Sequence, residues 1–178
     1  LIGFTCTGTF QLWLNCAQNF AKENVGWADP SIMQTYYSAG TMLALVVTAL
    51  LTRKIKDVRF ILGYPVICLV TMIAVLVGKS QTLMIAGAFL IGWAGAGGLL
   101  QIATSVCNML FPKIKGTVTA LVMIASSLCN YTILTAASKM QPSQVMVMNI
   151  VLTAVGVLLG LFVNLRYTKM VEQAQADN

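Results

Sequence analysis

The chain has 178 residues, of which 58% are hydrophobic and only 9% are charged, and its formal net charge is +6. This composition excludes an ordinary soluble domain, because so apolar a chain would aggregate in water. A helix needs about 20 predominantly apolar residues to cross the hydrocarbon core of a bilayer, and stretches of that length recur along the sequence. We therefore expect an all-α membrane protein whose surroundings are the lipid bilayer.

Six transmembrane helices are predicted, separated by short charged or turn-rich breaks. In chain order they cover residues 1–20, 31–52, 60–78, 82–111, 117–138 and 145–165. Together they form a single six-helix bundle over residues 1–169, followed by a hydrophilic tail over residues 170–178. The chain begins at Leu1 rather than at a methionine, which we interpret as the sign of a piece of a longer protein, whose C-terminus is the hydrophilic ending.

Basic residues predict the orientation of these helices, because Lys and Arg near the ends of a span stay on the cytoplasmic side. Those after the second, fourth and sixth helices are Arg53, Lys54, Lys56, Arg59, Lys113, Lys115, Arg166 and Lys169. The opposite loops hold only Lys22, Lys79 and Lys139. We therefore expect a multi-pass protein of the cell membrane with both termini in the cytoplasm. The excess of Lys and Arg in the predicted cytoplasmic loops also explains the positive net charge. Because the charge has this explanation, no nucleic-acid partner is predicted.

Catalytic and metal-binding chemistry finds little support in the sequence. The chain has no histidine, and its five cysteines are scattered singly within predicted helices, as is typical of small packing residues. Asp29 and Asp57 would lie at opposite ends of one helix, too far apart to share a proton. The sequence therefore predicts no enzyme, no metal and no cofactor.

Polar side chains form stripes on four of the six predicted helices when positions are counted at about 100° per residue. The stripes are Thr7, Gln11, Asn15 and Gln18; Gln34, Tyr37, Ser38, Thr41 and Thr48; Gln101, Thr104, Ser105 and Asn108 beside Trp93 and Gly97; and Ser127, Asn130 and Tyr131. The third and sixth helices carry few such residues, and we expect them to be lipid-facing supports.

The stripes have two interpretations. Polar side chains can bond helices to one another, each bond contributing about 0.6 kcal/mol on average. The stripes can also line a polar pathway, which we favour because helices packed on all sides would spread their polar groups around. The predicted pathway residues are Gln11, Asn15, Gln18, Tyr37, Trp93, Gln101, Asn108, Asn130 and Tyr131. The glycine-rich stretch 92–98 is interpreted as a site of close helix packing, since it lacks the context of a phosphate loop.

Two loops resemble the signature loops of the major facilitator superfamily (MFS). Residues 51–60 resemble a degenerate Asp-Arg-x-Gly-x-Arg-Arg loop, with Arg53 in place of Asp and Lys56 in place of Gly. Residues 111–116 resemble the family's Pro-x-x-Arg/Lys-Gly turn. The residues assigned to the two signature loops are Arg53, Lys54, Arg59, Pro112, Lys115 and Gly116.

The resemblance implies half of an MFS-type fold. The signature of that family is strongest in its first six helices, so the decayed first loop resembles the C-terminal half. In such a half, helices one, two, four and five line a central cavity, which is also the division that the stripes indicate. The implied activity is secondary active transport by alternating access. The implied partner is an N-terminal six-helix half in the same polypeptide, or a second copy in a parallel homodimer.

Substrate chemistry is constrained by the absence of charged residues deep in the predicted helices. Amide and aromatic side chains suit a small polar molecule such as a sugar or polyol, with a small organic anion or an amphipathic drug as alternatives. A different class of protein is the substrate-binding membrane subunit of an energy-coupling-factor vitamin importer, which is similar in size and helix number. Such subunits usually carry an Ala-x-x-x-Ala docking surface on the first helix, and residues 1–20 have none.

Overall fold

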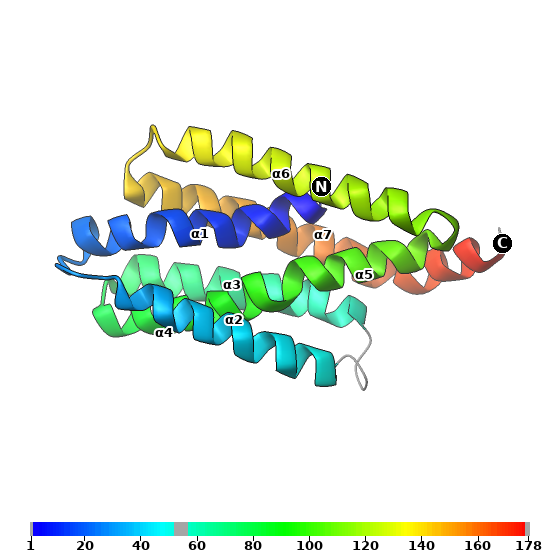
Figure 1. The fold of residues 1–178 in the computed structure, drawn as a ribbon, viewed down its shortest axis with the longest axis horizontal. Helices are drawn as coiled ribbons and strands as arrows, with labels where there is room; N and C mark the ends of the chain where they lie inside the picture. Colours follow the sequence, from blue (N-terminus) through cyan, green and yellow to red (C-terminus); the bar gives the residue numbers. More distant parts are fainter. Residues whose placement is uncertain (1, 52–56, 177–178) are drawn as a thin grey trace.

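The computed structural model describes residues 2–51 and 57–176, and these form a bundle of long helices (Figure 1). The elements are α1 (Ile2–Asn24), α2 (Ile32–Leu51), α3 (Asp57–Gly78), α4 (Gln81–Ile91), the π-helical segment η1 (Gly92–Leu99), α5 (Leu100–Leu110), the 3-10 turn η2 (Pro112–Ile114), α6 (Lys115–Ala137) and α7 (Pro142–Ala176). Because α4, η1 and α5 follow one another without a break, they act as one long helix from Gln81 to Leu110.

Within the described ranges, four helical segments are long and apolar enough to cross a membrane: Arg59–Gly78, Gln81–Leu110, Lys115–Ala137 and Pro142–Tyr167. The prediction of an all-helical membrane protein is therefore confirmed. α1 and α2, which carry two of the polar stripes, are not among these four segments. The count of six membrane-crossing helices stays a prediction for that reason.

Every stretch predicted as a span is helical where the structure describes it, and most helix ends lie within a few residues of the predicted ones. The exception is α7, which was expected to end at residue 165 and continues to Ala176. Residues 170–176, predicted as a hydrophilic tail, therefore continue the last helix.

The helices form two layers. α6, α1, α5 and α2 lie across the front of the view, and α7 and α3 lie behind them (Figure 1). α1 packs on both α6 and α7, α3 packs on α7, and α2 packs on α4 and η1. α2 and α6 lie at opposite edges of the front layer (Figure 1). The front layer thus holds the helices with polar stripes, and the back layer holds the two with few polar residues.

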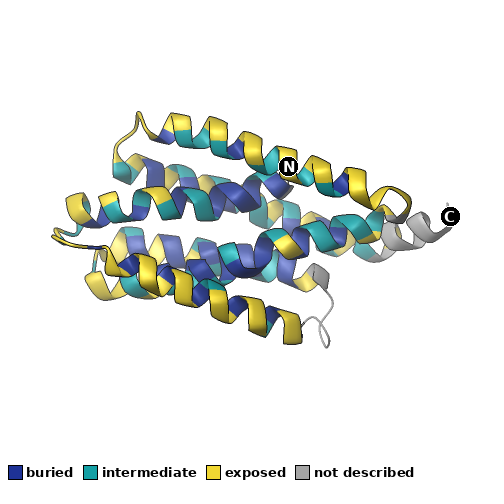
Figure 2. Cartoon of the chain, in the orientation of Figure 1, coloured by how far each residue is buried: buried dark blue, intermediate teal, exposed yellow. Residues whose placement is uncertain are grey.

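An apolar core fills the space between the layers. Phe20 of α1, Met72 of α3 and Met84 of α4 are fully covered within it. Exposed residues run along the outer sides of α2 and α6 (Figure 2), and Met42 of α2 is 71% exposed. An apolar exterior around a packed interior is the pattern expected of helices that face lipid or further helices.

The glycine-rich stretch lies in η1, where helix backbones approach closely. A Cβ atom at Gly92 would collide with the backbone carbonyl of Tyr37 on α2, and one at Gly97 would collide with the Cβ atom of Ala44. Thr41 reinforces this contact, because its hydroxyl donates a hydrogen bond of 3.2 Å to the carbonyl oxygen of Gly92. The structure therefore confirms close helix packing as the role of the stretch.

We predict that Gly92→Ala destabilises the protein by about 1–3 kcal/mol, because the added methyl group meets the carbonyl of Tyr37, which cannot rotate away. Gly63→Ala on α3 is the matched control, since a Cβ atom at Gly63 meets nothing within 4 Å. The control is expected to be neutral or slightly stabilising, because alanine favours a helix over glycine. Unfolding of the two variants in detergent checks the prediction, and equal stabilities would contradict it.

Candidate functional site

The polar stripe of α1 lies on an accessible side of that helix. Asn15 is exposed, and Gln11 and Gln18 are half-buried, whereas Trp13 and Phe20 of the opposite sides are buried. The side-chain amide of Asn15 donates to the backbone carbonyl of Gln11 at 2.8 Å and lies 3.4 Å from the side-chain oxygen of Gln11. α1 thus presents a row of three amides that its neighbours cover only in part, and two of them, Gln11 and Asn15, are hydrogen-bonded to each other.

Two recesses show which helices flank this row. On one side, Gln18 lines a small recess together with Gln34 and Tyr37 of α2. On the other side, Asn15 lines a larger recess together with Ser138, which follows α6. The amide row of α1 therefore faces outward between α2 and α6, which is the front of the bundle in Figure 1.

Tyr37 itself is largely covered and is only 8% exposed. Its backbone carbonyl accepts the hydroxyl proton of Thr41 at 3.0 Å, one turn further along α2. Because Tyr37 lines the same recess as Gln18, the structure brings these two predicted pathway residues together.

Two predicted pathway residues carry buried polar atoms that have no hydrogen-bond partner within the part of the chain that the structure describes. They are Trp93 in η1, through its indole Nε1, and Asn130 in α6, through its amide oxygen Oδ1. A buried polar group without a partner costs about 1–3 kcal/mol unless water, a ligand or another chain supplies the missing bond. Trp93 Nε1 can only donate and Asn130 Oδ1 can only accept, so each position could form one hydrogen bond with a polar molecule that reaches it.

The stripe of α5 divides into an open part and a paired part. Gln101 is exposed, as expected for a pathway residue. Asn108 instead contacts Thr119 of α6: its amide nitrogen lies 3.0 Å from the threonine Oγ1, and its amide oxygen lies 3.2 Å from the same atom. In this structure Asn108 therefore bonds α5 to α6, which is the alternative interpretation of the stripes.

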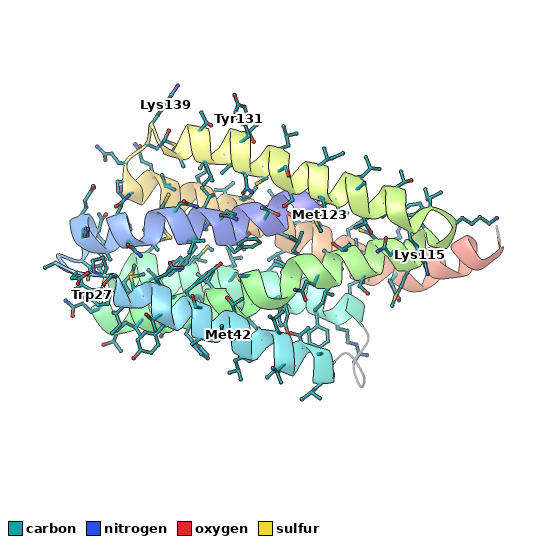
Figure 3. The ribbon with its side chains drawn as sticks, viewed as in Figure 1. Trp27, Met42, Lys115, Met123, Tyr131 and Lys139 are labelled. Carbon is teal, nitrogen blue, oxygen red and sulfur yellow. The ribbon has the colours of Figure 1, made fainter. Side chains whose placement is uncertain are left out.

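Tyr131 lies apart from the other predicted residues. Its side chain is 76% exposed and points outward from α6, away from the bundle (Figure 3). Asn130 precedes it in the chain, but the two side chains diverge because successive helical positions are about 100° apart. The structure does not bring Tyr131 together with the other predicted pathway residues.

Other stripe members also bond helices together. The hydroxyl groups of Thr7 on α1 and Ser126 on α6 lie 2.6 Å apart. On α2, the hydroxyl of Thr48 lies 2.7 Å from that of Tyr64 on α3. The stripes thus contain residues that bond one helix to another, which lie on covered sides. They also contain amides on the open side of α1 that do not bond to another helix among the described residues.

One polar cluster was missed by the sequence interpretation, which treated the sixth helix as a lipid-facing support. Asn149 of α7 is 1% exposed, and its side-chain amide donates to the backbone carbonyl of Thr9 at 3.0 Å. Thr153, one turn later, is also buried, and its hydroxyl lies 3.0 Å from that of Thr9. The signal was the spacing of four residues between Asn149 and Thr153, which places both on one side of the helix. This side of α7 therefore faces α1, not lipid.

The basic residues of the signature loops that the structure describes, Arg59 and Lys115, lie at one end of the bundle. Arg59, at the start of α3, is exposed, and Lys115 begins α6. Figure 3 shows Lys115 at the end opposite Trp27 and Lys139. Pro112 begins the turn η2, and Gly116 follows in the first turn of α6 with open space around it. The remaining predicted signature residues, Arg53 and Lys54, lie outside the described residues.

Charge is confined to the ends of the bundle. The segments 2–21, 32–51, 60–78, 81–110, 116–138 and 140–165 contain no Asp, Glu, Lys or Arg. In the loop between α1 and α2, the pKa of the Asp29 carboxyl lies below its usual value because Ser31 donates hydrogen bonds to it, the backbone bond being 3.2 Å long. The open face of the bundle is therefore polar but uncharged, and it can recognise a molecule only through neutral hydrogen bonds and ring contacts.

The Asn108 and Thr119 contact can be measured with a double-mutant cycle. We expect Asn108→Ala and Thr119→Ala to couple by about 0.6–1.7 kcal/mol in the free energy of unfolding, the range found for hydrogen bonds between membrane helices. Asn108→Ala combined with Ser127→Ala is the control pair, and its effects should add within about 0.5 kcal/mol. Additivity in both pairs would exclude the contact.

Comparison with known proteins finds similarity to three transport proteins. The uncharacterized MFS-type transporter YfkL of Bacillus subtilis (strain 168) is 37% identical over 136 residues, which are 73% of this chain and 33% of that protein. The inner membrane transport proteins YdiN and YdiM of Escherichia coli (strain K12) are 29% identical over 136 residues and 28% identical over 176 residues. These matches cover 75% and 95% of this chain, and 32% and 43% of the two proteins.

The chain therefore spans a third to somewhat under half of the length of these relatives. No family model matches the chain. No solved structure matches it either.

Proposed function

Because the chain belongs to the major facilitator superfamily, we propose that it is the C-terminal half of a secondary active transporter that moves a small polar solute by alternating access. In this proposal all six helical segments cross the membrane, α1 and α2 included. Two such halves rock against each other about a site near the middle of the membrane, which opens first to one side and then to the other.

One observation carries this proposal: the front helix α1 and the continuous helix that includes α5 keep amides exposed or half-buried well inside their length, away from the helix ends. Gln11, Asn15 and Gln18 on α1 and Gln101 on α5 are exposed or half-buried, while α3 and α7 lie behind (Figure 1). Uncovered amides are costly against lipid hydrocarbon, because each leaves donors and acceptors without partners. A second half placed over the front layer would enclose them in a polar cavity and remove that cost.

The solute that suits this face is small and uncharged. The front layer offers amide groups, the buried indole nitrogen of Trp93 and the unpartnered oxygen of Asn130. These groups form neutral hydrogen bonds and ring contacts, which favours a sugar or a polyol. A small organic anion would require positive charge from the opposite half, since the membrane-spanning residues of this chain have none.

The length of the relatives supports a partner of similar size. A chain that spans 33% to 43% of its matched relatives leaves room for an N-terminal six-helix half in the same polypeptide. A parallel homodimer is the alternative partner, because the halves of these transporters share one orientation. Similarity to an MFS-type transporter disfavours the vitamin-importer subunit.

We further propose that the protein lies in the plasma membrane with both termini in the cytoplasm. The basis is the collection of Arg59, Lys113, Lys115 and Arg166 at one end of the bundle. Positive side chains near helix ends are retained on the cytoplasmic side during insertion. The recess lined by Asn15 and Ser138 would then lie at the outer end.

Substitutions in the complete transporter test the pathway. Gln11→Ala and Gln101→Ala should each lower the rate of solute uptake about tenfold, the effect of losing one hydrogen bond to a polar solute. Thr71→Ala is the control, because Thr71 is buried in the back layer and donates to the carbonyl of Ile67 in its own helix. Uptake is measured at equal membrane abundance with the solute found by screening sugars, polyols and organic anions. Equal effects of all three substitutions would reject a pathway on the front face.

The mass of the native protein in its own membranes tests the partner. An antibody raised against residues 170–178 should detect a band at about twice the 19.1 kDa of this chain if both halves belong to one polypeptide. A band at 19.1 kDa would contradict the single-polypeptide arrangement, and cross-linking would then be expected to give a dimer.

A further inference from the structure

A recess of about 310 Å³ lies where the second half of α1 meets the end of α6 and the start of α7. Its lining consists of Asn15, Cys16, Asn19, Leu134, Ala137, Ser138, Met140, Pro142 and Val145. The volume falls in the lower part of the range of small-molecule sites, which is about 300–1,000 Å³. The recess lies near Lys139, at the end of the bundle opposite Lys115 (Figure 3).

The polar groups of this recess are mainly acceptors. Asn15 uses its amide nitrogen to donate to Gln11, which leaves its carbonyl oxygen for a further donor. Ser138 uses its hydroxyl proton to donate to the carbonyl of Thr135 at 2.8 Å, so its oxygen can only accept. Asn19 is exposed and adds a complete amide. The recess thus has more acceptors than donors.

Asn130 extends this set of acceptors toward the middle of the bundle. It lies one helical turn before Leu134, which lines the recess, and therefore on the same side of α6. Its Oδ1 atom is buried and has no hydrogen-bond partner among the described residues. A molecule that enters the recess and extends along α6 would supply the missing donor.

The lining distinguishes among donor-bearing molecules. Ammonium groups are good donors, but the lining has no carboxylate to balance their charge, and the basic Lys139 directly follows Ser138. Anions would meet the acceptor oxygens of Asn15 and Ser138. Hydroxyl groups donate without carrying charge, and they accept from the amide of Asn19 as well.

We propose that this recess, formed by α1, α6 and α7, is a binding site for an uncharged polyhydroxylated solute at the outer end of the bundle. The proposal rests on the proposed transport function and on its orientation in the membrane. It adds a site within this half of the transporter that is separate from the mid-membrane cavity between the halves. Asn15 belongs to both, so a solute can pass from the recess to the amide row of α1.

Cys16 supplies a direct probe, because it lines the recess and is half-buried. In the complete transporter with every other cysteine replaced, the membrane-impermeant thiol reagent MTSET, applied from outside, should label Cys16. A protein whose single cysteine is Cys68, which is fully buried, is the control, and labelling of Cys16 should be about tenfold faster. Labelling of Cys16 no faster than that of Cys68, or labelling only from the cytoplasmic side, would overturn the proposal.

Protection of Cys16 from MTSET then tests the chemical class of the ligand. Hexoses, hexitols, glycerol and inositol form the test panel, and trimethylamine N-oxide, which accepts hydrogen bonds but has no hydroxyl group, is the control. At least one hydroxylated solute should slow labelling, while the control should not. Protection by no panel member, or equal protection by trimethylamine N-oxide, would refute the proposed ligand class.

Substitution of Asn130 tests whether the site extends along α6. Asn130→Leu should raise the concentration of solute needed for protection about tenfold, because it removes one buried acceptor. Thr132→Ala should leave protection unchanged, because Thr132 is exposed, lies about 160° around α6 from Asn130, and donates to the carbonyl of Leu128 in its own helix. If Gln11→Ala lowers uptake while Cys16 stays unprotected, the recess proposal fails and the transport proposal stands. If uptake also fails to respond to Gln11→Ala, both fail.

Discussion

The packing of small residues around η1 is the contact on which the rest of the bundle depends. Gly92 and Gly97 let α2 approach from one side, and Gly98 lets the ring of Tyr64 on α3 approach from another. A Cβ atom at Gly95 would lie 3.2 Å from Phe10, so α1 is also close. In lipid, helices gain little from burying apolar surface against one another, and close backbone packing of small residues takes over as the source of association. η1 therefore holds three neighbours at once and fixes both layers of the bundle.

The layers determine which polar groups are paired. Thr9, Asn149 and Thr153 lie between the layers, and each finds a partner on the neighbouring helix. The amides of Gln11 and Asn15 lie on the open side and bond only within α1. Whether a polar side chain bonds to another helix or only within its own helix distinguishes the two interpretations of the stripes. Residue type distinguishes them less well, because the same residue types occur in both roles. Helix-bonding groups make at least one bond across an interface, although the amide oxygen of Asn149 has no partner among the described residues. The amides on the open side of α1 make no such bond between helices among those residues.

The sequence predicted the helices and the side of α1 that stays open, because both follow from patterns within one segment. An apolar stretch long enough to cross the membrane forms a helix, because the helix satisfies all of its backbone hydrogen bonds within one segment. The period of the helix then places Gln11 and Asn15 on one side. The pairing of Asn108 with Thr119 could not be predicted, because a helical wheel gives the direction of a side chain and not the neighbour it meets. The exposure of Tyr131 could not be predicted for the same reason, because a wheel does not show that no other helix covers that side of α6.

The π-helical segment explains a further gap in the sequence prediction. A count at about 100° per residue assumes α-helical geometry, and a π-helix has more residues in each turn. The angular relation between Trp93, near the start of this segment, and Gln101, just after it, is therefore shifted from the expected one. Sequence alone gives no direct sign of the π-helical turn beyond its four glycines at positions 92, 95, 97 and 98. The close packing of these glycines was predictable from the sequence. The effect of the π-helical geometry on the directions of the α5 side chains was not.

The helical segments proposed to cross the membrane carry no charged residues away from their ends, and this affects how easily the amide face of the front layer could release a bound solute. A buried charge binds an opposite charge strongly and costs several kcal/mol when that partner leaves. An amide such as Asn15 can return to a bond within its own helix, as it does with Gln11 here, so the empty state costs less. Among the described residues, Trp93 Nε1 and Asn130 Oδ1 are the predicted pathway atoms that are buried without a partner, and a molecule that bonded them would remove that cost. A face made of both kinds of group combines selective binding with ready release, which the proposed alternating-access mechanism would require.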